Sequence, residues 1–280
     1  MAPSVGIAGA GLIGGAVALR AAELGWTVGV FDTVPEHGRY AVERLGASFA
    51  AASLAELAAR SDTLVLAAPL GATLAHLAEL ARALPPNVAL VVDVASVKVP
   101  VSRAGAGVRG FVATHPIAGS ERSGPAAARA DLFAGRVWTV DADAPDDDRS
   151  RAVAFVEAMG ARPVAIACAE HDRVAALTSH LPQVVSTALA SHLAPELDAP
   201  HVRALCGTGI RSVLRLAGSS WTVWEAVLHA NAIPLAQEVR RLAAILTEVA
   251  GDLERDAPRG LERRFAQAAS VAGILSNPDL

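Results

Sequence analysis

The sequence has few cysteines, few aromatic residues and no long hydrophobic run. Its two cysteines, Cys168 and Cys206, match neither a disulfide framework nor a metal-ligand motif. We therefore expect structural thiols in a reducing cytoplasm, and no metal. The longest charge-free apolar stretch near the N-terminus, residues 5–19, is too short to span a bilayer and no basic segment precedes it. These absences predict a soluble protein.

Charged residues are also scarce, at 19% of the chain, and the formal net charge is −4. Lysine and arginine are not clustered, which argues against a nucleic acid or an anionic membrane as the main partner. Hydrophobic residues make up 52% of the 280 residues. A large buried core is therefore expected, in one large domain or two modest ones.

Short apolar runs alternate with helical patterns through the first 167 residues. Strands are predicted at 5–8, 27–31, 63–67, 88–92, 110–113, 137–140 and 163–167. This alternation predicts an α/β fold, a Rossmann-type doubly wound and mostly parallel sheet with helices on both faces. The acidic stretch 141–148 is predicted to be a surface loop, and a helix is predicted at 151–159.

The pattern changes near residue 168. Residues 170–193 are predicted to form one long helix, and the chain is again helical from Trp221 onward, with an apolar stripe at spacings of three and four. No strand is predicted beyond residue 167. We therefore expect a Rossmann-type domain over 1–167 and an all-helical domain over 168–280.

A glycine pattern follows the first predicted strand. Gly9, Gly11 and Gly14 match G-x-G-x-x-G, with Leu12 and Ile13 between them, and a predicted helix begins there. In this context the glycines allow a tight turn and close approach of a pyrophosphate to the helix N-terminus. The alternative is a glycine-rich turn that binds nothing.

Asp32 ends the second predicted strand, where a carboxylate would accept hydrogen bonds from the adenine-ribose hydroxyls. Its charge would repel a 2′-phosphate, so NAD is favoured over NADP. Arg39 follows shortly afterwards and leaves NADP open, because a basic residue there could pair with a phosphate.

Two polar residues follow later strands of the predicted sheet. Ser96 lies in the segment 93–98, and His115 lies on a loop that proline and glycine interrupt. Ligands of open α/β sheets bind at the carboxyl ends of strands, so both side chains are predicted near the cofactor. A hydrogen-bonded loop histidine is the usual alternative, but this location favours catalysis by His115.

The helical part holds further polar candidates. His180 and Gln183 lie three residues apart on one helical face, and Pro182 would kink the helix unless local contacts absorb its missing N–H. Arg215 is flanked by apolar residues, so its guanidinium is expected to have a definite partner. That partner is either a structural carboxylate or the carboxylate of a substrate.

The chain resembles the prephenate/arogenate (cyclohexadienyl) dehydrogenase family of tyrosine biosynthesis over most of its length. The resemblance lies in the segments 11–14, 93–98, 115–121, 179–182 and 213–217, and in Trp224 and Asn231, in family order. It implies oxidative decarboxylation of prephenate or arogenate, with hydride transfer to NAD+. It also implies a homodimer that pairs through the helical domains.

The resemblance also implies roles for individual residues. His115 would accept the proton of the ring hydroxyl, and Ser96 would orient that hydroxyl or His115. Arg215 would bind a substrate carboxylate, and His180 would shape the pocket. Many members that use prephenate have a second histidine where this chain has Gln183, so arogenate or dual use becomes more plausible. The sequence also ends without a regulatory domain, so allosteric control by tyrosine through such a domain is not expected.

Two other functions remain open at this point. A β-hydroxyacid dehydrogenase would share the fold but needs a catalytic lysine in the helical part, which contains no lysine. A non-catalytic NAD-sensing protein would not need the combination of His115, Ser96 and Arg215, and an assay of turnover distinguishes it from an enzyme.

Overall fold

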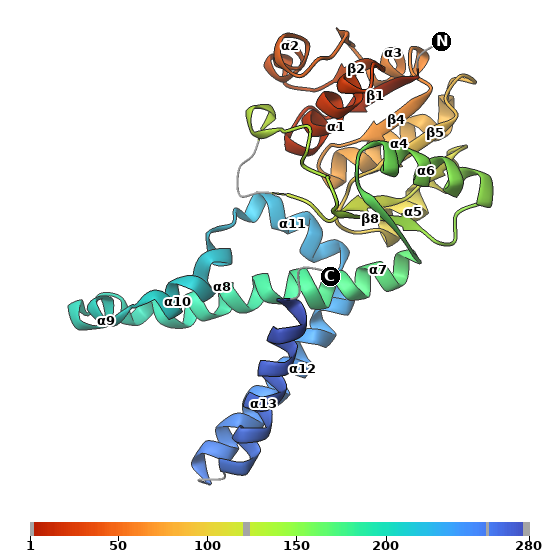
Figure 1. Cartoon of the computed structure of the whole chain (residues 1–280). Coiled ribbons are helices and arrows are strands. Elements are labelled where there is room, and N and C mark those ends of the chain that lie inside the picture. Colours follow the sequence, from red (N-terminus) through yellow and green to blue (C-terminus); the bar gives the residue numbers. More distant parts are fainter. Residues whose placement is uncertain (1–2, 120–123, 256–257, 277–280) are drawn as a thin grey trace. The chain divides into compact units, whose positions relative to one another are not determined.

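The computed structural model describes residues 3–119, 124–255 and 258–276. Its N-terminal part contains a six-stranded parallel sheet of order β3-β2-β1-β4-β5-β6 (Figure 1). The strands are β1 (Ser4–Ala8), β2 (Thr27–Phe31), β3 (Phe49–Ala50), β4 (Thr63–Leu66), β5 (Leu90–Asp93) and β6 (Phe111–Val112). The order reverses at β1, between β2 and β4, and this is the switch point at which dinucleotides bind in doubly wound folds. The predicted fold class is confirmed.

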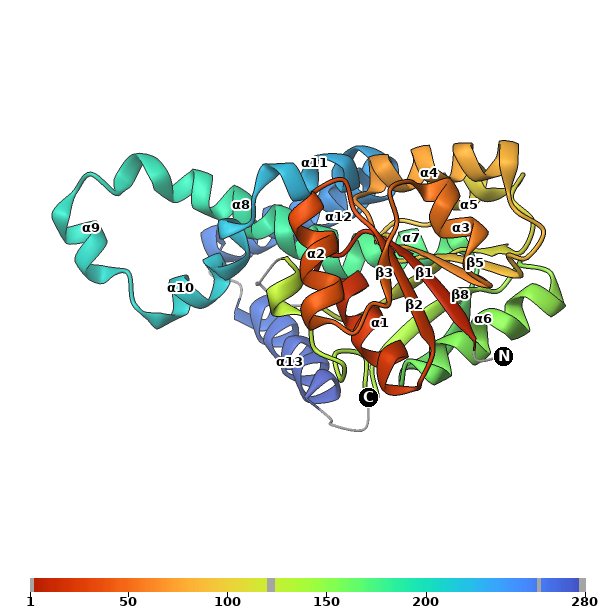
Figure 2. The same cartoon turned by 90° about the horizontal axis from the view of Figure 1, so that it is seen from above.

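Helices cover both faces of the sheet because its strands are apolar on both sides. One face packs on α1 (Leu12–Glu23) and α6 (Asp146–Ala158), which contribute Val17 and Phe155 to one core cluster. The other face packs on α3 (Leu54–Ala59), α4 (Leu70–Ala83) and α5 (Val99–Gly105), which form the second cluster. Figure 2 shows α4 on one side of the sheet and α1 on the other.

The last two predicted strands, 137–140 and 163–167, form a second sheet together with a strand that was not predicted, whereas the predicted strand 110–113 is β6 of the first sheet. This sheet contains β7 (Thr114–Pro116), β8 (Val137–Asp141) and β9 (Arg162–Ile166), with β7 antiparallel to β8. The prediction of a loop at His115 was therefore wrong: His115 lies within β7 and pairs with Thr139. Proline can end a strand, and Pro116 does so here.

The acidic segment 141–148 was also only partly a loop. Helix α6 begins at Asp146, five residues before the predicted start, and Asp146, Asp147 and Asp148 occupy its first turn. Carboxylates at a helix N-terminus interact favourably with its dipole, so acidic residues predict a helix start as well as a loop. Helix α2 (Pro35–Arg44) was not predicted at all, because its mean hydropathy is low and its buried residues are mainly small.

The long helix predicted near residue 170 is continuous but not uniform. It comprises α7 (Cys168–Ala175), a π-helical turn η2 (Ala176–His180) and α8 (Leu181–Leu193). The π turn directly precedes Pro182, so a wider turn absorbs the missing N–H as a local adjustment. His180 is the last residue of this π-helical turn.

The remainder of the described chain is helical, as predicted. After η3 (Ala194–Glu196), α9 (Pro200–Leu205) and α10 (Thr208–Val213) form a loop at the end of α8 (Figure 2), and η4 (Leu214–Gly218) packs back on α8. Helices α11 (Trp221–Ala230), α12 (Ala232–Glu254) and α13 (Pro258–Leu275) follow. A short turn η1 (Pro125–Ala127) precedes β8.

By their contacts, Met1–Asn231 form one compact unit and Ala232–Leu280 a second. The helices α7 to α11 therefore belong with the α/β part, and the domain boundary at 167/168 stays a prediction.

Among the described helices, none is both long and apolar enough to cross a membrane. Both cysteines are free, and burial raises the pKa of the Cys168 thiol to about 12, which suits a structural thiol.

A buried ion pair joins the two sheets. Lys98, the only lysine of the chain, donates from Nζ to Asp93 Oδ2 and to the carbonyl oxygen of Thr114 at 2.6 Å. The Lys98 and Asp93 side chains are 2% and 0% exposed. Asp93 ends β5 in the first sheet, and Thr114 begins β7 in the second. The Thr114 hydroxyl donates to the Asp93 carbonyl and accepts from Trp138 Nε1, so the network is fully hydrogen-bonded.

Replacing one partner of this pair should be costly. We expect Lys98→Met to lower the free energy of unfolding by about 3–5 kcal/mol, because it leaves the Asp93 charge buried and unpaired. Urea denaturation measures this loss. The double variant Asp93→Asn/Lys98→Met removes both charges and should lose less than the sum of the two single variants. Strictly additive losses would show that the two groups are not coupled.

Candidate functional site

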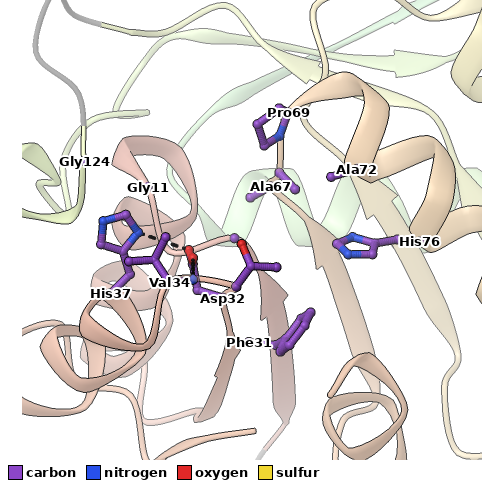
Figure 3. A pocket seen from close by; sticks show the side chains of 13 residues that line it. Gly11, Phe31, Asp32, Val34, His37, Ala67, Pro69, Ala72, His76 and Gly124 are labelled. Carbon is purple, nitrogen blue, oxygen red and sulfur yellow. Dashed lines mark hydrogen bonds and ion pairs between the residues drawn. The ribbon is translucent and has the colours of Figure 1, made fainter. Parts of the chain in front are cut away.

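A cavity of about 520 Å³ lies at the carboxyl ends of β1, β2 and β4. Its lining includes Gly9, Gly11, Asp32 and His37, and, from the segment after β4 and from α4, Pro69, Ala72 and His76. Figure 3 shows His37 and His76 approaching from opposite sides, with Asp32 between them. The cavity therefore occupies the switch point of the sheet, with the glycine pattern at one wall.

The glycine pattern forms the turn between β1 and α1. Gly9 has a φ of +105°, a conformation that residues with a Cβ rarely adopt. A Cβ on Gly14 would lie 1.9 Å from the Gly9 carbonyl oxygen, whereas a Cβ on Gly11 would meet no atom within 4 Å. Helix α1 has no side-chain cap, and Gly11 is its N-cap residue, next to Leu12 and Ile13. The first N–H groups of α1 are thus available to an anion beside open space.

Asp32 follows β2, as predicted, and its side chain is 11% exposed. It accepts hydrogen bonds from the backbone N–H groups of Ala10 and Val34, both at 2.8 Å, and His37 Nδ1 lies 3.4 Å from its Oδ2. The two backbone donors fix the carboxylate at the rim of the cavity. Arg39, the residue that left NADP open, pairs instead with Glu36 at 2.8 Å.

These residues fit a dinucleotide with an unphosphorylated adenine ribose. Asp32 places a negative charge where a ribose hydroxyl would bind, and the described residues that line the cavity include no lysine or arginine. His76 Nδ1 is the one buried side-chain N or O atom of the described residues without a hydrogen-bond partner. Burial also lowers the pKa of His76, so its imidazole is neutral at neutral pH.

His115 emerges from β7 next to the buried Lys98–Asp93 pair. Burial lowers its pKa well below the usual value, and the nearby Lys98, His171 and His180 lower it further. A neutral imidazole at neutral pH can accept a proton. His115 therefore has the electrostatic properties of a general base.

The sequence analysis missed the closest partners of His115. Its Nδ1 lies 3.0 Å from His171 Nε2, and His171 Nδ1 lies 2.9 Å from Asp172 Oδ1. His171 and Asp172 are buried residues of α7. The signal was available, since a histidine and an aspartate in the first turns of a helix seldom both face the core.

His180 lies in the same buried region. Its ring is 1% exposed and meets the Trp224 ring edge to face, with 5.8 Å between centroids. Asn231 Nδ2 donates to the Asp172 carbonyl oxygen at 2.7 Å and lies 3.1 Å from His180 Nδ1. Because that amide nitrogen is a donor, His180 Nδ1 accepts, and the proton of the neutral ring is on Nε2. Burial lowers the pKa of His180, although Asp172 partly opposes this.

The other predicted residues are placed as follows. Ser96 is half-buried in the segment after β5, and no hydrogen bond within the described residues joins it to His115, whose Nδ1 faces His171. Gln183 is buried, donates from Nε2 to the Leu216 carbonyl at 2.9 Å and accepts from Ser219 at 3.3 Å. Arg215 is exposed in η4 and has no ion-pair partner among the described residues.

A second cavity, of about 330 Å³, borders Gln183. Its wall is largely apolar and includes two tryptophans, Trp221 and Trp224, and the hydroxyl groups of Thr187, Ser219 and Ser220. Trp224 also contacts His180, so the cavity lies beside the buried histidine region. Among its described lining residues none carries a charge. Ser120 and Glu121, which belong to the segment that begins at His115, lie outside the described residues.

Comparison with family models gives two matches that together cover most of the chain. Residues 16–165 match the model of the nucleotide-binding domain of prephenate dehydrogenase. Residues 167–267 match the model of the prephenate dehydrogenase dimerization domain. The two matches meet where the sequence pattern changes from alternating strands and helices to helices alone.

Individual relatives agree with these matches. A Streptomyces niveus protein named "probable prephenate dehydrogenase NovF" is 38% identical over 165 residues, which is 56% of this chain and 45% of that protein. Prephenate dehydrogenase of Bacillus subtilis is 27% identical over 96% of this chain and 75% of its own length. The structure of prephenate dehydrogenase from A. aeolicus, in complex with hydroxyphenyl propionate and NAD+, has a TM-score of 0.88 at 24% identity and covers 99% of both chains. It supports the fold.

Removing the charge of Asp32 should change dinucleotide binding in two directions. We expect Asp32→Asn to raise the Kd for NAD+ about tenfold or more, since a hydrogen bond to a charged group contributes about 1.5–3 kcal/mol. The Kd for NADP+ should fall, because a 2′-phosphate no longer meets a carboxylate. Isothermal titration calorimetry measures both constants.

Glu43→Gln is the matched control, because it removes an exposed charge of α2 that does not line the cavity. Unchanged Kd values in Asp32→Asn would show that Asp32 does not contact the ribose.

Proposed function

Since this chain belongs to the prephenate dehydrogenase family and is an NAD-dependent dehydrogenase that carries out an oxidative decarboxylation, we propose that His115 is its base and that its substrate is arogenate, prephenate or both. The observation that carries this proposal is the neutral, half-buried imidazole of His115 in β7, three residues beyond the end of β6 in the parallel sheet. A neutral histidine can accept a proton at neutral pH, as a positioned general base must.

When bound, NAD+ takes a hydride from the ring carbon that bears the hydroxyl group. His115 accepts, or shares through a strong hydrogen bond, the proton of that hydroxyl as its oxygen becomes carbonyl-like. The ring carboxylate leaves as CO2, its bonding electrons make the ring aromatic, and the proton returns to the phenol oxygen. The reaction therefore releases no net proton, so His115 has to hold a proton only briefly.

His180 assists in this scheme as a donor. With its proton on Nε2, it offers an N–H group within the same buried region in which His115 offers a lone pair. Ser96, after β5, is assigned to the substrate hydroxyl rather than to His115, because His171 already occupies His115 Nδ1. Gly9, Gly11, Leu12, Ile13 and Gly14 hold the pyrophosphate, and Asp32 binds the adenine ribose.

The substrate side chain is proposed to extend toward the cavity beside Gln183. The amide of Gln183 is already engaged by Leu216 and Ser219, and it carries no positive charge. A keto-acid side chain gains no charge-assisted contact there, so we favour arogenate, which carries an ammonium group on its side chain. Arg215, exposed and without an ion-pair partner in the described chain, is free to bind a substrate carboxylate.

We also propose a homodimer that pairs through the helical part. Large apolar side chains are exposed along α12 and α13, among them Ile233, Leu253, Phe265 and Leu275. Exposed apolar surface on this scale is typical of an interface. We place the enzyme in the cytoplasm, where its two free thiols would stay reduced.

A steady-state assay tests the proposed function. We expect NADH to form with arogenate at a higher kcat/KM than with prephenate, and NADP+ to be a poorer acceptor than NAD+. The test variant is His115→Asn, which should lower kcat about 10²- to 10⁴-fold, the usual contribution of a positioned base. An unchanged Kd for NAD+ in this variant serves as the control for folding. No reduced cofactor with either substrate would refute the activity, and near-normal kcat in His115→Asn would refute the base.

Removing Arg215 should weaken substrate binding. We expect Arg215→Ala to raise KM about tenfold or more with a small change in kcat, because a carboxylate contact contributes about equally to the ground and transition states. The matched control is Arg211→Ala, which replaces an exposed arginine of α10 whose side chain, within the described residues, bonds only the Cys206 carbonyl. Equal KM values in the two variants would show that Arg215 does not bind a substrate carboxylate.

A further inference from the structure

Two buried side chains, Asp172 and His171, form a line of hydrogen bonds that ends at the half-buried His115. Asp172 is held by its neighbours: its Oδ1 accepts from the Lys98 backbone N–H at 2.6 Å, and its Oδ2 accepts from the Val99 backbone N–H at 2.8 Å. His171 bridges Asp172 and His115 through its two ring nitrogens. The side chains of His171 and Asp172 are each only 4% exposed, so water does not compete for these contacts.

The direction of each hydrogen bond in this line follows from Asp172. An ionised carboxylate only accepts, so His171 Nδ1 carries a proton and donates it. The other nitrogen of a neutral His171, Nε2, is then without a proton and accepts. His115 Nδ1 must therefore be the donor across the 3.0 Å contact. In a neutral imidazole with a proton on Nδ1, Nε2 carries a free lone pair.

We propose that His171 and Asp172 are positioning residues that hold His115 in the tautomer whose Nε2 is ready to accept the substrate hydroxyl proton. Once Nε2 is protonated, the new positive charge on His115 is stabilised through His171 by the Asp172 carboxylate. This proposal rests on the proposed function, since it assigns His115 Nε2 the role of the base.

The arrangement also suits a reaction that releases no net proton. A base that returns its proton to the product needs no exit path to solvent, and this line ends at a carboxylate that two backbone N–H groups hold in place. Burial and Lys98 oppose protonation of His115. In the proposed arrangement, the Asp172 carboxylate favours it through His171. The two effects keep the base neutral at rest and make its protonated form accessible in the transition state.

The tautomer of His115 can be measured without turnover. In protein labelled with ¹⁵N-histidine at pH 7.5, the His115→Asn variant identifies the His115 signals among the eight histidines. We expect a protonated Nδ1 and an unprotonated Nε2 in the wild type. An Nε2-protonated His115 would overturn the proposal, even if the enzyme turns over arogenate. Conversely, the protein could show the expected tautomer and still form no NADH. That outcome would confirm the hydrogen bonds from Asp172 to His115 and refute the proposed function.

Two variants test the consequence for catalysis. Asp172→Asn turns an acceptor into a donor toward His171, which reverses the line and moves the His115 proton to Nε2. We expect kcat to fall about 10²- to 10⁴-fold, as for reversal of the tautomer in a hydrolase triad, with the KM and the Kd for NAD+ within twofold of wild type. A kcat within threefold of wild type, or an unmoved tautomer, would refute the positioning role.

Because Asp172 also anchors two backbone N–H groups, Asp172→Asn can disturb folding, and variants of His171 keep the test decisive. His171→Gln retains an oxygen that accepts from His115 Nδ1 and an N–H that donates to Asp172, whereas His171→Leu retains neither. We expect His171→Gln to keep a kcat at least tenfold above that of His171→Leu at equal thermal stability. Equal values of kcat in these two variants would contradict the proposal.

Discussion

The buried ion pair between Lys98 and Asp93 is the constraint on which the site depends. It joins the end of β5 in the parallel sheet to the start of β7 in the second sheet, directly before His115. The Lys98 backbone N–H also anchors Asp172 at the start of α7. One residue thus connects both sheets with the helix that carries His171. Such a pair contributes little net stability by itself, but each group becomes costly once its partner is lost.

The same residues set the acid–base properties of His115. Its pKa is lowered by burial, by Lys98 and by the two neighbouring histidines, which keeps the imidazole of His115, the proposed base, neutral at neutral pH. His115 and His180 are expected to be opposite tautomers because their partners differ. Asp172, acting through His171, places the His115 proton on Nδ1, whereas Asn231 leaves the His180 proton on Nε2. In the proposed arrangement, the site therefore offers one proton acceptor, His115 Nε2, and one donor, His180 Nε2.

Much of this arrangement was predictable from the sequence. Alternating apolar runs predicted the doubly wound sheet, and the glycine pattern and Asp32 predicted the wall of the dinucleotide cavity. The second sheet was missed because β6 and β7 are short and adjacent, so that periodicity does not separate them. The partners of His115 were missed for another reason: His171 lies 56 positions away, and only tertiary packing brings the two rings together.

The most direct test of the central claim is a crystal structure of this chain with NAD+ and a 4-hydroxyphenyl product analogue. The phenol oxygen should lie about 2.6–3.2 Å from His115 Nε2, within hydrogen-bond reach, while His115 Nδ1 keeps its contact with His171. A phenol oxygen bound elsewhere, with His115 Nε2 facing protein or solvent, would contradict the assignment of His115 as the base.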